Sequence, residues 1–583
     1  MKWFVKKCSV KAEDLMNFYG VRKPLAYALY NRKIRNRDEI KRYIDTDNFC
    51  FENIENLSGV KEAFSIIKEA INKKKKIFIY GDYDADGVMS TSIMYKGLYG
   101  LEADVNYFIP NRVEDGYGLN DKAVEKLIDE GAELIITCDN GISAISQIQL
   151  AKSKGIKVII LDHHEPPFEE LNEVKNEILP DADAVVDAKI ENCGYKFTQM
   201  CAGGLCYRFI CGLYKFLGRK LEFCDELCEL AAVATICDVV DLVDENRAIA
   251  AKGLKFINSG SRNLGLKTLI ELKEIKSVNS YSIGFVIGPC INASGRLDSA
   301  KIAVELFVTN DIKRAMELAE QLNNFNEERK SITVDCLNRI TNNIENSDLK
   351  EDKIIVVYDK ETHESVAGII AGRIKERYCR PAIVLTNAEE GVKGSGRSVE
   401  AYNMFKGLLR VKDIMIKFGG HTMAAGMSLE EHNIEIFRQR LNNECALTFE
   451  EMSPVLRVET ILDIEDISVE SAGELNILAP FGKANEKPLF GIKNVIAENI
   501  RFVGSEGNIV SFNIERNGKR VKAVDFDNYD LWIKWLNDNG YDEENYRLAR
   551  INIDTVFALD VNEYNGYTNP QIIIKDIRMT NKK

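Results

Sequence analysis

The chain has no run of about 18 or more consecutive apolar residues, so the sequence predicts no transmembrane helix. Its opening residues, Met1 to Lys7, lack the apolar core of a secretory signal peptide. The fourteen cysteines include no Cys-x-x-Cys pair, and spacings such as Cys201, Cys206 and Cys211 do not suit a zinc knuckle. These absences predict a cytoplasmic protein whose cysteines are reduced thiols.

Positive charge is also scarce. Lysine and arginine number 77 against 90 aspartates and glutamates, which gives a net charge of −13. This charge argues against a general nucleic-acid coat, although it leaves room for a local basic groove. No Ser-His-Asp arrangement points to a protein nucleophile. The length of 583 residues predicts three or four domains at roughly 100–200 residues each.

The sequence is organised around residues 81–87, Gly-Asp-Tyr-Asp-Ala-Asp-Gly, in which three carboxylates occupy alternate positions. The apolar run 77–80 before them predicts a buried strand, and residues 88–98 after them predict a helix. The acids therefore lie on a strand-to-helix turn, where open α/β sheets bind ligands. Three packed anions repel one another, so they favour a divalent cation, and their oxygens suit Mg²⁺ or Mn²⁺. The alternative is a polar loop with solvated acids.

Two further strands end in the same kind of residue. Strands expected at 134–137 and 158–161 are followed by Cys-Asp-Asn-Gly and Asp-His-His. The alternation with helices, and further strands expected at 103–108 and 184–187, predict a parallel sheet whose strand ends meet at one edge. Two of the chain's five histidines lie there. The side chains expected to converge at this edge are Asp84, Asp86, Asp139, Asp162, His163 and His164.

Asp238 interrupts the apolar end of a helix that is expected to begin near Cys224. A buried aspartate there needs a partner. It could cap the helix or form a structural pair, but the acidic cluster at the sheet edge gives metal binding the better explanation.

These motifs resemble the four motifs of the DHH phosphoesterase superfamily: Asp-Tyr-Asp-Ala-Asp-Gly, Asp-Asn-Gly, Asp-His-His and the later Asp238. Further segments are similar to the RecJ family of exonucleases within that superfamily. They are residues 110–119, 288–297, 363–369, 394–398, 419–421 and 478–482. The resemblance runs from about residue 50 to the C-terminus.

The resemblance implies two metal ions, Mn²⁺ or Mg²⁺, with Asp139 bridging them. Their implied ligands are Asp84, Asp86, Asp139, His163 and Asp238. The implied catalytic residues are His164, Asp139 and Asp82, and His164 would contact the phosphate. Many superfamily members carry a histidine where this chain has Tyr80, which is a poorer ligand. Two cations about 3.5–4 Å apart can activate water and stabilise an in-line phosphoryl displacement.

The resemblance and the strand and helix pattern together predict an α/β protein with a C-terminal β-barrel. Its expected parts are a helical lead-in (1–50), a parallel-sheet DHH catalytic domain (51–246), a helical connector (247–346), a smaller α/β DHH-associated substrate-binding domain (347–450) and an OB-fold nucleic-acid-binding domain (451–583). The polar stretch 311–343 predicts one long connecting helix. A coiled-coil surface is the alternative, but the heptad is broken. Composition alone indicates only a β domain after residue 456; the OB-fold follows from the resemblance.

Several small and basic residues are candidates for a nucleic-acid path. Glycines near Ser395 permit close approach of a ligand, and arginine binds phosphate bidentately. An ordinary turn explains this loop equally well, but the nearby segment 419–421 favours phosphate binding. The expected nucleic-acid and phosphate contacts are Arg112, Arg296, Arg373, Ser395, Gly396, Arg397 and His421. Each arginine could instead form a structural ion pair, above all Arg373 on its helix.

The sequence therefore predicts a metal-dependent 5′→3′ exonuclease that degrades single-stranded DNA to 5′-mononucleotides in DNA repair and recombination. The resemblance also implies a monomer with no membrane contact that works with a single-strand-binding protein and a helicase. One alternative is a DHH phosphodiesterase of short oligoribonucleotides, nucleotides or pyrophosphate, against which the C-terminal β domain argues. The other is a binding module without catalysis, against which the retained ligands argue.

Overall fold

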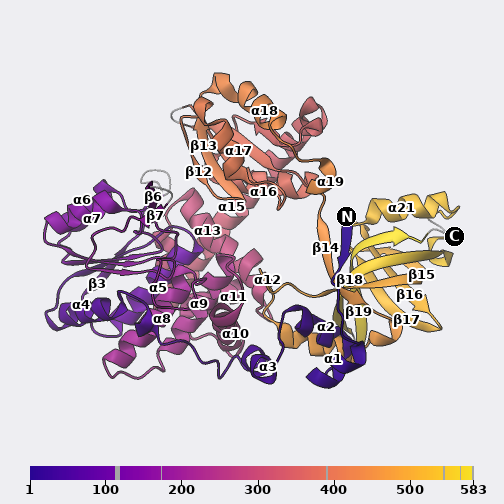
Figure 1. The fold of residues 1–583 in the computed structure, drawn as a ribbon, viewed down its shortest axis with the longest axis horizontal. Helices are drawn as coiled ribbons and strands as arrows, with labels where there is room; N and C mark the ends of the chain where they lie inside the picture. The colour runs from indigo at the N-terminus through magenta and orange to yellow at the C-terminus, as the bar shows by residue number, and fades with distance from the viewer. Residues whose placement is uncertain (112–117, 172–173, 389–390, 543–544, 565, 581–583) are drawn as a thin grey trace. The chain divides into compact units, whose positions relative to one another are not determined.

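The computed structural model describes residues 1–111, 118–171, 174–388, 391–542, 545–564 and 566–580. They form two compact units, which Figure 1 shows as a ribbon. The larger unit consists of Thr46–Met452 and Gly482–Asn485. The smaller unit consists of Met1–Asp45, Ser453–Phe481 and Glu486–Lys583.

A five-stranded sheet, in the order β3-β2-β4-β5-β8, forms the first part of the larger unit, and every neighbouring pair is parallel. Its strands are β2 (Ile77–Tyr80), β3 (Val105–Phe108), β4 (Leu134–Cys138), β5 (Lys157–Leu161) and β8 (Ala184–Val186). The parallel sheet expected from the alternating pattern is thus confirmed. A separate antiparallel hairpin, β6 (Phe168–Leu171) with β7 (Val174–Glu177), follows β5.

Helices cover both faces of this sheet, and consecutive residues of β2 enter different cores. Ile77 and Ile79 belong to one core, whereas Phe78 and Tyr80 belong to the other. The helices on the first face are α4 (Val60–Asn72), α5 (Ala85–Tyr99), α8 (Ala202–Phe216) and α9 (Cys224–Cys237); those on the second are α6 (Asp121–Asp129) and α7 (Ile145–Ser153). Burial on both faces explains why the strands are apolar throughout.

A mainly helical segment follows. Its elements are α10 (Asp244–Asn258), α11 (Leu264–Leu272), α12 (Ser280–Ser282), a π-helical turn (Ile283–Ile287), α13 (Gly288–Leu297), α14 (Lys301–Val308) and α15 (Ile312–Glu345). Asp311 caps α15 by accepting hydrogen bonds from the N–H groups of Lys313 (2.8 Å) and Arg314 (3.2 Å). Leu322 belongs to the core of the parallel sheet, and Ile340 to that of the next domain. The long connecting helix expected over 311–343 is therefore present.

The second α/β domain has a mixed sheet in the order β12-β13-β11-β10-β9. Its strands are β9 (Ile355–Tyr358), β10 (Ala382–Asn387), β11 (Val392–Arg397), β12 (Lys417–Gly420) and β13 (Ala424–Leu429). Only β9 and β10 are parallel. Its helices are α16 (Glu364–Tyr378), α17 (Met404–Arg410), α18 (Ile434–Asn443) and α19 (Phe449–Met452).

The smaller unit contains a closed five-stranded barrel, because β15 pairs with both β16 and β18. Its strands are β15 (Leu489–Val503), β16 (Ile509–Arg516), β17 (Lys519–Asp525), β18 (Arg550–Tyr564) and β19 (Tyr567–Met579). Two helices accompany it, α20 (Val469–Glu474) and α21 (Tyr529–Asp538). The sequence pattern did not predict α21, whose Trp532 is buried and donates a hydrogen bond to Asp525 (3.0 Å).

The N-terminal residues also belong to the smaller unit. β1 (Lys2–Val5) pairs in parallel with β14 (Val455–Ile461), and β14 pairs with β15. Three helices, α1 (Ala12–Tyr19), α2 (Lys23–Asn31) and α3 (Arg37–Ile44), follow β1. The lead-in is thus helical, as expected, but its first strand extends a sheet formed by the far end of the chain.

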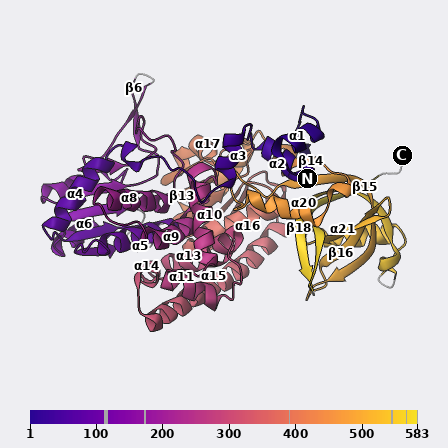
Figure 2. The ribbon, with the colours of Figure 1, turned by 90° about the horizontal axis from the view of Figure 1, so that it is seen from below.

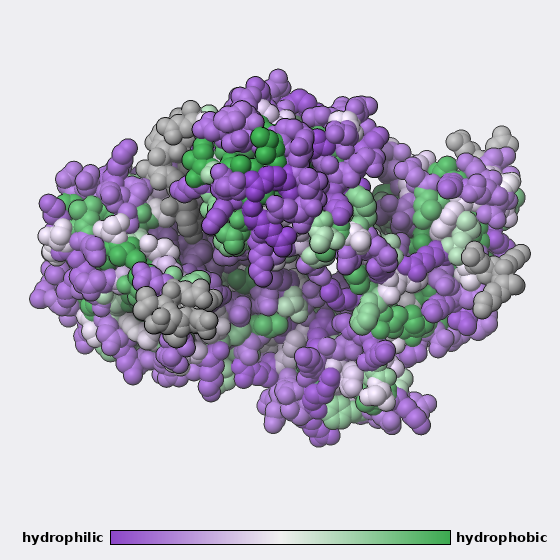
Figure 3. Space-filling view, turned by 45° about the horizontal axis from the view of Figure 1, so that its top comes forward, coloured by the Kyte–Doolittle hydropathy of each residue, from purple (hydrophilic) through white to green (hydrophobic). Residues whose placement is uncertain are grey.

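Across the described ranges, no helix combines the length and the apolar character needed to cross a membrane. The face shown in Figure 3 is mostly hydrophilic, with hydrophobic residues in separate patches. All fourteen cysteines are free thiols. Figure 2 shows the same elements as Figure 1 from below.

Candidate active site

The turn between β2 and α5 carries the first acidic motif. Asp84 is the N-cap of α5, and its Oδ1 accepts hydrogen bonds from the N–H groups of Asp86 (2.9 Å) and Gly87 (3.0 Å). Asp82 and Asp86 are buried, whereas Asp84 is exposed. The cap therefore holds three carboxylates together at the end of a buried strand.

Helix α13 supports this turn from the other side. The side-chain carbonyl of Asn292 accepts a hydrogen bond from the backbone N–H of Ala85 (2.8 Å). Gly295 approaches the turn so closely that a Cβ atom there would lie 2.5 Å from the carbonyl oxygen of Tyr83. This contact explains physically why a glycine occupies that position of the 288–297 segment.

The N-terminus of α8 fixes the carboxylate of Asp86. The backbone N–H groups of Ala202 and Gly203 donate hydrogen bonds to its two oxygens, at 2.8 and 2.7 Å. A Cβ atom on Gly203 would lie 2.3 Å from the Cβ of Ala234 in α9 and 3.1 Å from Asp86. Neither Ala202 nor Gly203 was predicted as a site residue; the signal for them is the run of small residues that opens α8.

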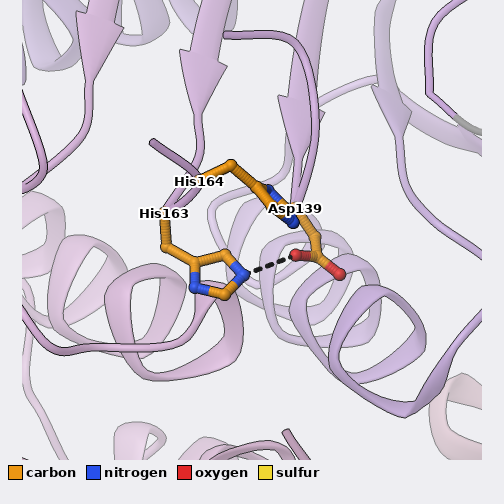
Figure 4. Close-up of side chains that lie close together, drawn as sticks. All are labelled: Asp139, His163 and His164. Atoms are coloured by element: carbon orange, nitrogen blue, oxygen red, sulfur yellow. Dashed lines mark hydrogen bonds and ion pairs between the residues drawn. The ribbon is translucent and has the colours of Figure 1, made fainter. Parts of the chain in front are cut away.

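Asp139 follows β4 and has a φ of +66°, in the left-handed region that residues with a side chain rarely adopt. Backbone outliers of this kind cluster at functional sites. His163 lies after β5, and its Nε2 is 3.0 Å from the Oδ1 of Asp139. Figure 4 shows the imidazole of His163 directed at this carboxylate. The same nitrogen is 3.6 Å from Asp86, and His163 Nδ1 is 3.9 Å from Asp238. His163 therefore joins the acids of three different elements.

His164 is held by the remaining residue of the third motif. Its Nδ1 lies 2.7 Å from the Oδ1 of Asp162, whose other oxygen accepts a hydrogen bond from the N–H of Ile142 (2.9 Å). Burial lowers the pKa of His164, but the hydrogen bond and the charge of Asp162 outweigh it and raise this pKa to about 9. The imidazole is therefore positively charged near neutral pH.

Three sets of side chains have ligand atoms within 4.8 Å of one another. They are Asp82, Asp84 and Asp139; Asp86, His163 and Asp238; and Asp139, His163 and His164. Asp139 and His163 each belong to two sets. The donors are carboxylate oxygens with imidazole nitrogens, which suit Mn²⁺ and Mg²⁺, so the residues present fit the expected cations.

The electrostatics of the cluster agree with that fit. Burial raises the pKa of the carboxyl groups of Asp86, Asp139 and Asp238, that of Asp238 to about 8, and the nearby charge of Asp84 adds to the effect. Burial lowers the pKa of His163, which favours the neutral imidazole that binds metals. A divalent cation would offset the repulsion among these carboxylates.

Tyr80 occupies the position where many DHH proteins have a histidine. Its ring is fully buried and stacks on Phe108 at a centroid distance of 5.4 Å, and its hydroxyl donates a hydrogen bond to the carbonyl of Gly118 (3.0 Å). Tyr80 is therefore part of the core on one face of the sheet.

Asp187 was not predicted as a site residue, although it follows β8 at the same sheet edge. It is fully buried; its Oδ1 accepts a hydrogen bond from the N–H of Lys189 (2.7 Å), and its Oδ2 has no hydrogen-bond partner among the residues described here. Burial raises the pKa of Asp187 to about 8, and the charge of Asp162 adds to this. The sequence signal that could have identified Asp187 is an acidic residue directly after the fifth parallel strand.

We expect Asp187→Asn to change how stability depends on pH. The folded pKa of about 8 exceeds the ordinary unfolded value of about 3.9, so folded wild-type protein binds the extra proton between those pH values. The free energy of unfolding of the wild type should therefore fall as pH rises. That of Asp187→Asn should fall less over the same pH range. Urea unfolding measures this at pH 5 and pH 9. From pH 5 to pH 9, the free energy of unfolding of Asp187→Asn should rise by about 1 kcal/mol or more relative to that of wild type. An equal difference at both pH values would contradict this account.

The expected phosphate contacts in the second α/β domain lie around the start of α16. Arg397 donates hydrogen bonds to the hydroxyl of Ser395 (3.1 Å) and the carbonyl of Gly396 (2.8 Å). A Cβ atom on Gly368 of α16 would lie 2.7 Å from Arg397 and 2.9 Å from Ser395. Arg296 of α13 donates to the carbonyl of Ser365 at 2.5 Å, so the two arginines contact neighbouring turns of one helix.

The other predicted contacts are more dispersed. His421 follows β12 and is exposed, and its N–H donates to the carbonyl of Ala424 (2.8 Å). Arg373 lies further along α16, is largely exposed, and has its guanidinium 3.6 Å from Glu376. Arg112 lies outside the described residues.

Comparison with known proteins supports this architecture. Three family models match: the DHH family N-terminal domain over residues 76–235, the DHHA1 domain over 351–447 and the RecJ OB domain over 458–576. The single-stranded-DNA-specific exonuclease RecJ of Bacillus subtilis is 36% identical over 583 residues, covering 99% of this chain and 70% of the relative. That of Salmonella typhimurium is 34% identical over 580 residues, covering 95% and 96%.

Solved structures agree. The crystal structure of Thermus thermophilus RecJ in complex with Mn²⁺ matches with a TM-score of 0.80 and 26% identity, covering 100% of this chain and 80% of that one. The Mg²⁺ complex of the same protein gives 0.75 and 25%, covering 100% and 79%. The three domains and the acidic sheet edge define a hydrolase of the DHH phosphoesterase type. The chain belongs to the RecJ family of single-stranded-DNA-specific exonucleases. The family and fold class expected from the sequence are confirmed.

Proposed function

We propose that this protein degrades single-stranded DNA in the 5′→3′ direction, releases 5′-mononucleotides and uses two divalent cations, Mn²⁺ or Mg²⁺. The observation that carries the proposal is the shared position of Asp139, which belongs to two of the three sets of candidate ligands. One carboxylate between two sets supports a pair of cations held close together. The names of the curated relatives support single-stranded DNA as the substrate.

Each residue of the site has a definite part in this proposal. The residues that would hold the cations are Asp84, Asp86, Asp139, His163 and Asp238. Asp82, proposed as catalytic, also groups with Asp84 and Asp139 and could serve as a further ligand. When bound, the cations supply Lewis acidity and lower the pKa of water at the site, so no protein nucleophile is required. The charged His164, kept protonated by Asp162, would donate a hydrogen bond to a phosphate oxygen.

The strand would follow the surface between the parallel sheet and α16. Arg296 and Arg397 contact neighbouring turns of that helix and would hold phosphodiester oxygens. Arg112, Ser395, Gly396 and His421 complete the proposed contacts. The OB domain would bind bases of the strand by stacking. In the cell we propose a cytoplasmic monomer that acts in DNA repair and recombination with a single-strand-binding protein and a helicase; its free thiols support the location.

The experiment that tests this function follows a long single-stranded DNA labelled at one end. With Mn²⁺ or Mg²⁺, we expect mononucleotides to be released first from a 5′ label, because the proposed polarity begins there. A duplex of the same sequence should resist, and EDTA should stop the reaction by removing the cations. Release that starts at a 3′ label would overturn the polarity. Turnover of dinucleotides or pyrophosphate without cleavage of long DNA would overturn the substrate.

A further inference from the structure

A group of basic side chains lies where α13, α15 and α16 come together, and none of them belongs to the metal cluster. These three helices lie side by side in Figures 1 and 2 and contact one another. The group comprises Lys273 after α11, Arg329 and Lys330 on α15, and Arg373 on α16. The first three lie close enough to Cys290 of α13 for their charges to lower the pKa of its thiol against the effect of burial.

Few carboxylates neutralise this group. Glu327 serves both lysines, at 3.4 Å from Lys273 and 2.9 Å from Lys330. Among the described residues, Arg373 has one ion-pair partner, Glu376 at 3.6 Å; both side chains are about 60% exposed, so this ion pair contributes little. The group therefore keeps an excess of positive charge.

Arg329 is the unusual member. Its side chain is partly buried, and its Nη2 donates a hydrogen bond to the neutral amide oxygen of Asn326 (2.9 Å). Its buried Nε has no hydrogen-bond partner, and the guanidinium forms no ion pair, within the ranges that the structure describes. Burial lowers its pKa, and the positive charge of Arg373 lowers it further, against the opposing effects of Cys290 and Glu327. A desolvated cation that faces a second cation calls for an anion.

The position of Arg329 and Arg373 suits contact with the substrate strand. Helix α13 carries Asn292, which contacts the acidic turn, and Arg296, which contacts Ser365 at the start of α16. Arg373 lies eight residues beyond Ser365, or about 12 Å along the helix axis. The pair is therefore connected to the active site through two shared helices but is separate from the phosphate contacts of Arg296.

We propose that Arg329 and Arg373 together bind a phosphodiester group of the substrate strand other than the one being cleaved. This inference rests on the proposed function, because it assumes a strand longer than one phosphodiester. Two planar guanidinium groups, one of them with an unused buried donor, match the oxygens of a phosphodiester better than lysine does. Binding would give Arg329 a directly hydrogen-bonded anion, which the described residues do not provide.

The test compares Arg329→Gln, Arg373→Gln and the double variant with a matched control, Arg314→Gln. Arg314 lies on the same helix, but Glu305 (2.6 Å) and Glu317 (3.2 Å) already neutralise it. Binding of a fluorescent single-stranded oligonucleotide is measured in EDTA at several salt concentrations. We expect each single variant to bind about tenfold more weakly, with a salt slope smaller by about 0.7, as for one lost phosphate contact. The fold-loss in affinity of the double variant should be smaller than the product of the two single-variant losses, because both arginines would bind the same phosphate.

Substrate length then locates the phosphate. For Arg329→Gln with Mn²⁺, kcat/KM on a long strand should fall about tenfold, whereas turnover of a dinucleotide and inhibition by a 5′-mononucleotide should stay unchanged. An equal loss on the dinucleotide, or equally weakened inhibition, would place the residue at the scissile phosphate or the product and overturn the proposal. Binding losses no larger than those of Arg314→Gln would also overturn it.

Two further measurements separate this outcome from other failures. Arg329→Lys keeps the positive charge but lacks the planar guanidinium, so it should recover part of the strand binding that Arg329→Gln loses. A purely structural role would instead lower the Tm of both Arg329 variants, with no recovery of binding in Arg329→Lys. That outcome would overturn the proposal. Failure of the proposed function would appear in wild-type protein, as no metal-dependent degradation of the strand. The binding measurement in EDTA does not depend on that result.

Discussion

Asp139→Ala should lower the turnover of single-stranded DNA at saturating Mn²⁺ by at least about 10³-fold, or ~4 kcal/mol in the barrier. Asp139 is the one carboxylate common to two sets of candidate ligands among the described residues, and it also lies 3.0 Å from His163. If the site holds two cations as proposed, its removal should weaken both cation positions at once. Strand binding measured in EDTA should stay within about twofold of wild type, because the proposed phosphate contacts lie on other residues.

The control for this variant is Asp129→Ala, which removes an exposed carboxylate at the end of α6 and should leave turnover within about twofold. Stability separates lost chemistry from misfolding. Burial and its neighbours' charges raise the pKa of Asp139, so without metal the variant should have a Tm equal to or above that of wild type. Added Mn²⁺ should raise the Tm of wild type more than that of the variant. Turnover within about tenfold of wild type would show that Asp139 is dispensable.

Gly203→Ala should lower turnover by at least about 10²-fold, although the new methyl group touches no substrate. A Cβ atom there would lie 2.3 Å from Ala234, so α8 must move away from α9. That movement displaces the two backbone N–H groups that orient the carboxylate of Asp86. We also expect overpacking to cost about 1–3 kcal/mol of stability.

Mn²⁺ titration identifies the cause of this loss. If Asp86 is misplaced, the concentration of Mn²⁺ needed for half-maximal activity should rise in Gly203→Ala. The matched control is Gly473→Ala in α20, where nothing lies within 4 Å of the new Cβ; helix propensity there favours alanine by up to ~1 kcal/mol. An unchanged Mn²⁺ requirement, with only a lowered Tm, would show that Gly203 affects stability and does not position Asp86.

The sheet-edge cluster was predictable because it depends on local patterns. A buried parallel strand followed by an acid places that acid at a known edge, and this rule brings Asp86, Asp139 and His163 together from the sequence alone. The same rule extends to Asp187, but nothing in its local sequence resembles a motif that would single it out. The partners of Asp86 on α8 could not be predicted, since backbone N–H groups carry no sequence signature.

Elements defined by distant contacts were harder to predict. The four residues of β1 carry no signal for their pairing with β14, which lies near the other end of the chain. Helix α21 was missed because β-like runs surround it, and its fold depends on burying Trp532. The proposed pairing of Arg329 with Arg373 joins two helices, so neither segment alone predicts it.

The pairing of β1 with β14 has a consequence for the order in which the protein acquires its structure during synthesis. β1 leaves the ribosome well before its partner strand β14, which is translated only after nearly all of the larger unit. At about 5–20 residues per second, the wait is roughly 20–90 s. During that time a short strand with Phe4 and Val5 on its surface has no sheet to join. Until β14 is made, β1 is therefore open to chaperones or to a wrong strand partner.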